Sequence, residues 1–439
     1  MDADARPAYS GDDDPGCSHR PRSLLTPACS MAPISGMLPA MDRRHFLAIA
    51  GAFGLRMHAQ MPGLPAGTTR PDIAAIDHDR ILRLAGVYLQ QKPTTITAFP
   101  AERSQATPND FYSEDPEWFP DVDPEKPWVR HQGERNPNAF HAHGDALLRM
   151  AQVIPAFAAA WLITKDAKYV SAALLHLRAW FLTPETRMNP SLNHAQAIQG
   201  VAEGRATGIL ETIYLVEVVR AISFLATSED FPDTDLKGLR SWFADYAHWM
   251  YDSTLGQGER DTRSIHGICW VAQAGEYARF ANIATISGYC LRRFREVLLT
   301  LISLDGNFPA ALASPAPFAN SIFHLECLAL TCEVLSTPFE SQWTFQTSDG
   351  KGLRSAVAFM APSLENKQQW RYRSDAQNFR DLPLRPLSLY LAGRAYQRPE
   401  YTAIWKALPP DPPDFDNLAL LRLYPARQPL LWSRRVPGI

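Results

Sequence analysis

The sequence predicts an all-α fold, because apolar residues recur at three- and four-residue steps in one segment after another, while strand-like alternation is scarce. A hydrophobic fraction of 46% and a charged fraction of 20% are ordinary for a globular protein with a sizeable core. Thr183-Pro184 ends one of the periodic segments, because proline cannot continue a helix. We expect helices over residues 146–162, 169–181, 207–225, 237–251, 267–280, 283–301, 321–335 and 352–360.

Long connections that carry proline, asparagine and glycine join these segments, at residues 94–137, 184–206, 253–266 and 304–320. Loops of this length in a compact domain are usually functional. Helical hairpins arranged in a ring, with the long loops forming a cleft at one end, would accommodate the pattern. No linker divides residues 71–439, so we expect a single domain there.

The first sixty residues are typical of an export region. Residues 1–40 are rich in Asp, Pro, Ser and Arg without hydrophobic periodicity, so we expect them to be disordered and to precede a true translation start at Met41. Arg43-Arg44, a short apolar run and small residues near position 59 have the layout of a twin-arginine signal over residues 41–59. The run is too short for a membrane anchor. These features predict a periplasmic or secreted protein; the alternative is a disordered arm followed by a short buried helix.

The charge balance argues against nucleic acid as the main partner. The formal net charge is -3 and the sequence pI is ≈ 6.5, whereas nucleic-acid binding usually needs a broad basic surface. A local basic groove for an anionic sugar polymer is compatible with these values, because net charge says nothing about its distribution.

The cysteines and histidines give no pattern that predicts a metal or a cofactor. No two cysteines have Cys-x-x-Cys spacing, and His141-x-His143 is a lone pair in a loop. A phosphate loop and a Gly-x-Gly-x-x-Gly fingerprint after a strand are both absent from the sequence, so we expect no cofactor. We interpret the four cysteines beyond residue 260 as buried thiols. A disulfide between Cys269 and Cys290 is the alternative.

Three polar clusters are candidates for chemistry. The first is the loop that carries Asn193, His194, Gln196 and Arg205, whose amides and guanidinium can grip hydroxyls and carboxylates of a sugar chain. Loop capping and turn chemistry are the alternative for these residues.

The other two clusters stand at helix starts. His266 precedes the apolar segment 267–280, where a helix N-terminus favours a neutral imidazole that can accept a proton. A structural histidine in the core is the alternative. His324 and Glu326 follow Asn320 at the start of 321–335, and we expect them to cap, to belong to the core or to line the cleft.

These clusters, in this order, resemble the alginate lyase domain family over residues 130–375. The resemblance implies an (α/α) toroid, an incomplete helical barrel with a cleft for an anionic uronate polysaccharide. We expect the protein to be a monomer. The segments that carry it are Trp180-Phe181-Leu182, Thr186-Arg187-Met188-Asn189-Pro190, Asn193-His194-Ala195-Gln196, Gly204-Arg205, Ile265-His266-Gly267 to Trp270, Asp305-Gly306-Asn307-Phe308-Pro309, Ser321-Ile322-Phe323-His324-Leu325-Glu326 and Asp349-Gly350-Lys351-Gly352-Leu353.

The family reaction is β-elimination, which needs donors that neutralise the uronate carboxylate, a base for the C5 proton and an acid for the leaving O4. This chain departs from the family pattern at four places. Ser264-Ile265-His266 stands where Asn-Asn-His is expected, and Asn320 stands at the usual Tyr. The usual Arg falls near Ser314, and His194 replaces a common Tyr. Losing an acid, a carboxylate donor or a cation costs about 2–4 kcal/mol of transition-state stabilisation each.

The leading hypothesis is a lyase that cleaves an alginate-like uronate polysaccharide, with His266 as base or carboxylate partner. The resemblance leaves His194 as a substitute acid, and Arg205 and Arg187 as substitutes for the lost positive charge. Trp270 either stacks beneath the sugar or belongs to the core. The substrate-binding residues expected besides the two arginines are Asn193, Gln196, Ser264, Trp270 and Asn320.

Two other functions are compatible with the sequence. A carbohydrate-binding relative without catalytic activity would explain the altered positions, and it would bind glycan without forming product. A glycoside hydrolase on a helical toroid would need two carboxylates about 5–10 Å apart across the cleft. Glu203 and Glu211 are the candidates for that pair, by position alone.

Overall fold

A computed structural model describes residues 71–375, 379–414 and 417–436, all of which belong to the unit Leu64–Ile439. The predicted upstream segment 1–40 and the predicted export signal 41–59 lie outside the described residues. Both stay predictions, and so does the periplasmic or secreted location.

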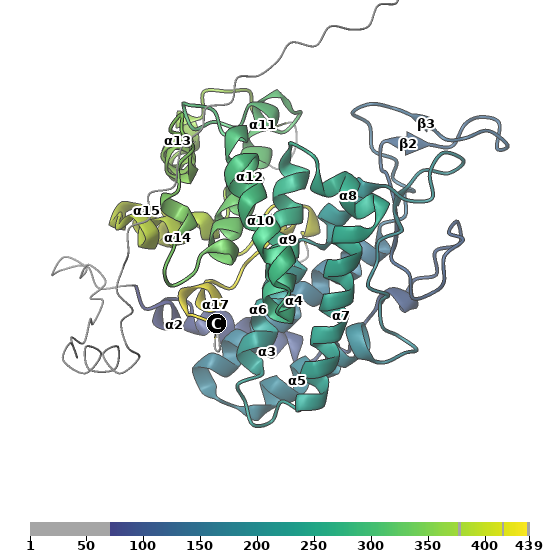
Figure 1. The fold of residues 1–439 in the computed structure, drawn as a ribbon, viewed down its shortest axis with the longest axis horizontal. Helices are drawn as coiled ribbons and strands as arrows, with labels where there is room; N and C mark the ends of the chain where they lie inside the picture. Colours follow the sequence, from purple (N-terminus) through teal and green to yellow (C-terminus); the bar gives the residue numbers. More distant parts are fainter. Residues whose placement is uncertain (1–70, 376–378, 415–416, 437–439) are drawn as a thin grey trace, which may run out of the picture. The chain divides into compact units, whose positions relative to one another are not determined.

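Helices dominate the described residues (Figure 1), which confirms the predicted all-α class. The α-helices are α2 (Ile73–Ile76), α3 (His78–Tyr88), α4 (Ala142–Thr164), α5 (Ala167–Leu177), α6 (Leu215–Leu225), α7 (Asp233–Asp252), α8 (Thr254–Arg260), α9 (Ile265–Ala281), α10 (Ala284–Glu296), α11 (Pro309–Ala313), α12 (Pro317–Leu335), α13 (Leu353–Glu365), α14 (Leu387–Tyr396), α15 (Pro399–Ala407), α16 (Leu418–Leu421) and α17 (Pro429–Ser433). The 3-10 helices are η1 (Ile96–Ala98), η3 (Ala206–Thr212), η4 (Leu298–Leu301), η5 (Gln342–Thr344), η6 (Lys367–Gln369) and η7 (Phe379–Asp381), and η2 (Arg178–Leu182) is a π-helix.

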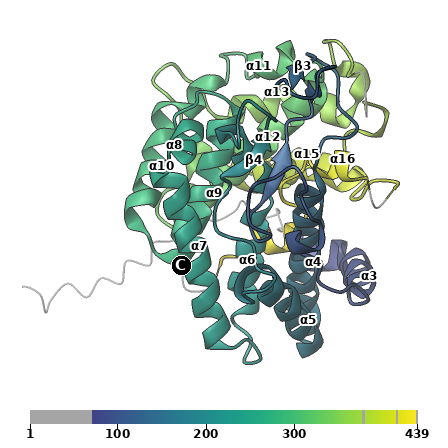
Figure 2. The same cartoon turned by 90° about the vertical axis from the view of Figure 1, so that its right-hand side faces the viewer.

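In the described part of the chain, four short strands form two small two-stranded sheets. β1 (Tyr112–Glu114) pairs in parallel with β4 (His194–Ala197), which is labelled in Figure 2, and the register shifts along the pair. β2 (Trp118–Phe119) pairs antiparallel with β3 (Val129–Arg130). All four belong to the long connections rather than to the helical body.

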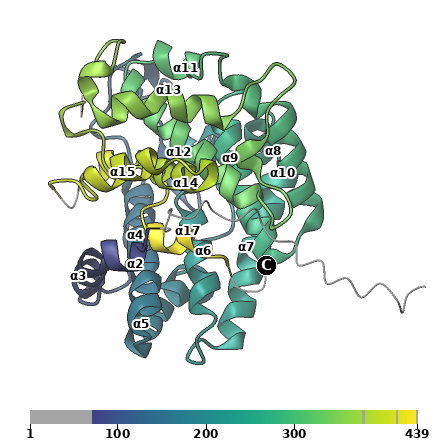
Figure 3. The same cartoon turned by 90° about the vertical axis from the view of Figure 1, so that its left-hand side faces the viewer.

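The helices form an inner and an outer layer (Figure 3). The inner helices α4, α6, α9, α12 and α14 are buried on nearly every side; in α6, for example, ten of its eleven residues are buried. Each outer helix buries only one stripe of side chains along its length. In α7 the buried residues Leu239, Trp242, Phe243, Tyr246 and Met250 recur at helical spacing, and this face packs on α9. The same arrangement, in which a buried inner helix is flanked by outer helices, therefore recurs along the chain.

Two inner helices, α4 and α12, are long and apolar enough to cross a membrane by length and composition. Their most apolar windows are 83% and 89% buried inside the fold. The core position accounts for this apolar character, because a helix that is hydrophobic all round must be covered on all sides.

Several predicted segments differ from the observed elements; for example, the predicted helix 169–181 is divided into α5 and η2, and the predicted connection 304–320 contains α11 and the first residues of α12. The segment 207–225 is broken into η3 and α6, because the hydroxyl of Thr212 bonds to the carbonyl of Ile209 and to Gln273 Oε1 (3.1 and 2.7 Å), which competes with regular helix. The segment 283–301 is likewise divided into α10 and η4. The predicted connection 253–266 contains the helix α8, which Ser253 caps through the amide of Gly256 at 2.9 Å.

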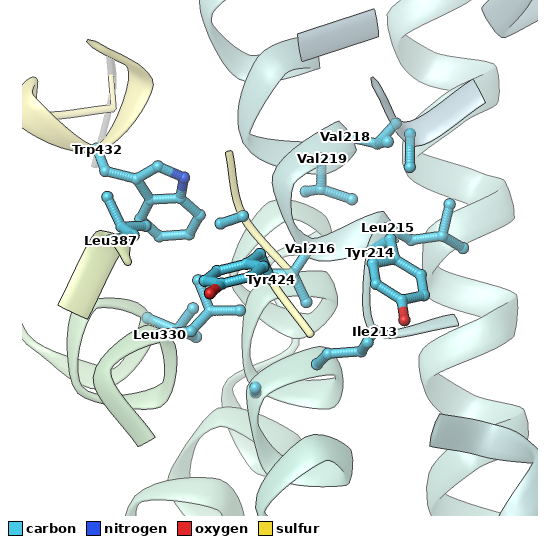
Figure 4. Close-up of a cluster of buried hydrophobic side chains, with 14 of the residues drawn as sticks. Ile213, Tyr214, Leu215, Val216, Val218, Val219, Leu330, Leu387, Tyr424 and Trp432 are labelled. Carbon is cyan, nitrogen blue, oxygen red and sulfur yellow. The ribbon is translucent and has the colours of Figure 1, made fainter. Parts of the chain in front are cut away.

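Buried carboxylates tie distant helices together. Glu326 of α12 accepts from the backbone amides of Leu387 and Ser388 at 2.9 Å each and so caps α14. Glu217 of α6 accepts in the same way from the amides of Arg427 and Gln428 at the start of α17, both at 2.8 Å. Figure 4 shows the apolar cluster around this junction, where the side chains of α6 lie near those of Leu330, Leu387 and Trp432. We expected Glu326 to cap, to belong to the core or to line the cleft, and these hydrogen bonds support the capping role.

The four cysteines of the described residues are buried free thiols, as predicted. The sulfur of Cys269 lies 3.6 Å from that of Cys327, on the neighbouring helix α12. The alternative disulfide between Cys269 and Cys290 is therefore wrong. The other two buried thiols are Cys290 and Cys332.

Candidate functional site

A cleft of about 910 Å³ opens between the helical body and the long connections. Each of the four predicted connections contributes lining residues, among them Ser113, Gln196, Ser264 and Asn320. The prediction that these connections form a cleft is confirmed. The volume is that of a typical small-ligand site, large enough for a few sugar units.

Cationic and neutral polar groups line the cleft near the start of α4. Asp145 pairs with the guanidinium of Arg422, and its other oxygen lies 3.4 Å from Nε2 of His141. Asp145 thereby holds both groups at the cleft, where His141 and Arg422 are lining residues. The exposed Arg135 lines the cleft as well. This wall is suited to carboxylates of an anionic polymer.

His266 forms a tight pair with a buried carboxylate beside the cleft. Its Nδ1 lies 2.6 Å from Oε1 of Glu259, whose side chain is 1% exposed. Burial raises the pKa of Glu259, and the hydrogen bond from His266 opposes that shift. Because a carboxylate accepts, Nδ1 carries the proton and Nε2 keeps its lone pair. His266 is 30% exposed and follows Ser264 and Ile265, which line the cleft.

His324 lines the cleft and has the same tautomer. Its Nδ1 lies 2.7 Å from the carbonyl oxygen of Asn320, which can only accept, so Nε2 is the free acceptor. Burial, together with a smaller electrostatic effect of His266, lowers the pKa of His324 to about 4, although the hydrogen bond to the Asn320 carbonyl opposes the shift. The two imidazoles are thus within electrostatic reach of each other. Of the interpretations left open for His324, the structure supports the cleft position.

Replacing His324 with phenylalanine should reduce the decrease in the free energy of unfolding that the protein shows as the pH is lowered. Well above pH 6.5 the ring is neutral in the folded and unfolded chains alike. As the pH falls towards about 4, the unfolded chain gains a proton that the folded chain resists, so stability drops by roughly 3 kcal/mol. Denaturant unfolding between pH 7 and pH 4 measures this. The exposed His248, replaced in the same way, is the control and should leave the curve unchanged.

Gln196 reaches the cleft through a network that Arg205 organises. The Arg205 guanidinium donates from Nε to the carbonyl of Gln196 at 2.9 Å and from Nη2 to Oε1 of its side chain at 3.3 Å, and it also pairs with Asp115. The φ of Gln196 is +56°, a left-handed conformation that a non-glycine residue holds only when its surroundings fix it. Arg205 therefore positions Gln196, and it is not among the residues that line the cleft.

The structure brings only some of the predicted residues to the cleft. Gln196, Ser264 and Asn320 line it, whereas His194 lines a second cavity of about 400 Å³ together with Glu203. Ser264 also caps α9 by accepting from the amide of His266 at 3.2 Å. The hydrolase hypothesis loses its proposed pair, because Glu211 lines the first cavity and Glu203 the second.

Three further predicted residues lie away from the cleft lining. Asn193 is exposed and accepts from Nε1 of Trp249 at 3.0 Å, and Arg187 is exposed on the connection before β4. Trp270 is wholly buried, and its indole nitrogen donates to the carbonyl of Met250 at 3.1 Å. The expectation that Trp270 stacks beneath a sugar is wrong, since its ring belongs to the core between α9 and the aromatic side chains of α7 and α10.

Sequence reasoning missed the groups that come from distant parts of the chain. Arg422 reaches the cleft from beyond α16, and Arg135 comes from the loop after β3. Near the position of the missing family arginine, the guanidinium of Arg373 bonds to the carbonyl of Ser314. No local pattern marks these three arginines. In the part of the chain that the structure describes, no cluster of three or more metal-ligating side chains occurs.

Comparisons with known proteins agree with this architecture. The family model described as alginate lyase matches residues 95–370. An alginate lyase structure from Bacteroides ovatus aligns with a TM-score of 0.69 and 24% identity, over 80% of this chain and 94% of that one. Alginate lyase A1-III from Sphingomonas species A1 aligns with a TM-score of 0.48 and 14% identity, over 73% and 88%. No curated protein matches the chain.

The likeness to the Bacteroides ovatus structure confirms the predicted fold, an (α/α) toroid that forms an incomplete helical barrel. The family match covers well over half of the chain. The chain therefore belongs to the alginate lyase family of polysaccharide lyases.

Proposed function

We propose that this chain cleaves an alginate-like uronate polysaccharide by β-elimination, with His266 as the base. The observation that carries the proposal is the His266–Glu259 pair at the start of α9. Glu259 fixes the tautomer and the orientation of the ring, as a second carboxylate does in other histidine bases. Nε2 is then the atom that takes the C5 proton of the sugar.

The cleft supplies the other contacts that the reaction needs. Arg135 and Arg422 line the cleft, Arg422 held there by Asp145, and would pair with uronate carboxylates, which makes the C5 proton more acidic. Nε2 of His324 accepts from a sugar hydroxyl. The Ser264 hydroxyl is free to donate its proton, because its oxygen accepts from the amide of His266. Together these groups take over part of the work of the Asn and Arg side chains that the family usually has.

A binding protein without catalytic activity is the second candidate, and one observation favours it. Asn320 stands where the family has its Tyr, and its amide donates to the hydroxyl of Ser314 at 2.7 Å. An amide in that position cannot give a proton to the leaving oxygen. The polymer would then be held in the cleft without being cut.

Incubating the full chain with polymannuronate, polyguluronate and glucuronan separates the two candidates. Elimination leaves a double bond between C4 and C5, so a lyase produces a steady rise in near-ultraviolet absorbance on at least one polymer. A flat trace on every polymer, with binding seen by calorimetry, would overturn the proposed lyase and favour the binding protein. New reducing ends without new absorbance would point to hydrolysis.

We also propose that the protein acts outside the cytoplasm as a monomer. Support for export comes from the twin-arginine pattern over residues 41–59 and from the size of a polysaccharide substrate.

A further inference from the structure

Glu211 stands on the wall of the cleft with one oxygen engaged and one oxygen open. Its Oε1 accepts from Oγ of Ser113 at 2.7 Å and from Nε2 of Gln196 at 2.5 Å. Both donors are held in place: the backbone N–H of Gln196 donates to Oγ of Ser113 at 2.8 Å, and Arg205 donates to the backbone carbonyl of Gln196. Two donors at Oε1 leave Oε2 as the oxygen that carries a proton.

The space beside Oε2 is kept free by a glycine. Gly144 lies in the first turn of α4 and lines the cleft. A Cβ at this position would lie 3.1 Å from Oε2 of Glu211, closer than ordinary van der Waals contact. Among the described residues, no hydrogen bond or ion pair reaches Oε2, because the nearby Arg422 pairs with Asp145 instead. A larger residue than glycine would cover the one open oxygen.

The surroundings of Glu211 favour its protonated form. Burial raises its pKa, while the hydrogen bonds from Gln196 and Ser113 oppose the shift. The charged groups that act on it are Arg422, which lowers the pKa, and Asp145, which raises it. The phenols of Tyr214 and Tyr246 also lie within electrostatic range of this carboxyl group. A carboxylic acid kept neutral in this way is able to donate a proton.

Other groups along the cleft are less suited to be the acid. The hydroxyl of Tyr214 donates to the carbonyl of Arg422 at 3.0 Å, and burial raises its pKa well above the usual value. Glu114 is closed off, because Arg103, Tyr112 and the amide of Phe140 occupy its oxygens. Burial opposes ionisation of Glu114, yet these hydrogen bonds lower its pKa overall.

We propose that Glu211 is the proton donor to the leaving O4 in the elimination, in place of the family tyrosine. The role rests on the lyase function proposed above. His266 takes the proton from C5, and the electron pair of that C–H bond forms the double bond between C4 and C5. The C4–O4 bond breaks with its electron pair going to O4, which takes the proton from Oε2 of Glu211. The carboxylate and imidazolium that remain return to their starting forms by proton exchange with water.

The test compares two substrates on the full chain with Glu211→Gln. The first substrate is the uronate polymer, whose sugar leaving group needs a proton. The second is a uronate with a nitrophenyl ether at O4; its C4–O4 bond breaks to release nitrophenolate, a leaving group that needs no proton. We expect E211Q to lower turnover on the polymer by about 10²- to 10⁴-fold and to change turnover on the nitrophenyl substrate little. Wild-type activity on the polymer should also fall as the pH rises through the raised pKa of Glu211, and this loss of activity should be absent in E211Q.

Two further variants keep the result interpretable. Glu203→Gln changes an exposed glutamate of the second cavity and should match the wild type on both substrates. Gly144→Ala should lower polymer turnover selectively, because its Cβ crowds Oε2 while alanine preserves the helix. Equal losses of E211Q on both substrates, or no loss on the polymer, would overturn the role of Glu211 alone. A wild-type chain inactive on both substrates would overturn the lyase function itself, and this role with it.

Discussion

Replacing His266 with alanine should lower turnover on a uronate polymer by about 10²- to 10⁴-fold, the usual contribution of a general base. The ring that would accept the C5 proton is lost, while Ser264 still caps α9 and the cleft wall is kept. The initial rate of near-ultraviolet absorbance, measured at saturating polymer, reports the change. Polymer affinity should change much less, because the contacts to carboxylates come from arginines elsewhere in the cleft.

Two variants show whether the effect comes from the chemistry of the ring. Glu259→Gln keeps the imidazole but weakens its orientation, so we expect an intermediate loss of about 10- to 100-fold. His248→Ala removes an exposed histidine from α7 and should leave the rate unchanged. An H266A variant with wild-type turnover would show that another group removes the C5 proton.

Replacing Trp270 with alanine should lower the free energy of unfolding by about 3–5 kcal/mol, since a large buried side chain leaves a cavity behind. The indole is wholly buried, and it packs edge-on against Tyr289 with ring centroids 5.9 Å apart. Its hydrogen bond to the carbonyl of Met250 is lost as well. Denaturant unfolding followed by circular dichroism gives the change.

The matched comparison is Trp249→Ala, one turn from the end of α7. Trp249 is half-buried and donates to the exposed Asn193, so its loss should cost clearly less stability. The KM of folded W270A should equal that of the wild type. A variant with normal stability and a raised KM would mean that the indole contacts the sugar after all.

Helical periodicity predicted the body of the fold well, because apolar spacing is a local property of the chain. The break at Thr212 was not predictable from spacing, since it depends on a hydrogen bond to Gln273 some sixty residues later. The helix α8 was missed for a different reason: it is short and polar, with little apolar periodicity to mark it.

The candidate site was predicted only in part. The residues that were missed lie far along the chain from the groups that hold them. His266, Ser264 and Asn320 stand next to family motifs, which located them. Trp270 belongs to the same motif, yet an aromatic residue one turn into a helix has the same sequence pattern whether it faces a sugar or the core. Arg422 is paired with Asp145, 277 positions earlier in the chain, and no local pattern links the two. Glu211 was a candidate by position only, since its donors come from two strands that pair across the fold.

The return of the C-terminal segment to the start of the fold sets the order in which the cleft is assembled during synthesis. Arg422 completes one wall of the cleft, and residues 427–432 anchor that segment to Glu217 of α6. Arg422 is therefore synthesised only after nearly all of the helices have left the ribosome. A chain that ended before Arg422 would lack both this wall residue and the backbone amides that pair with Glu217, so the cleft and the packing around α6 are completed together.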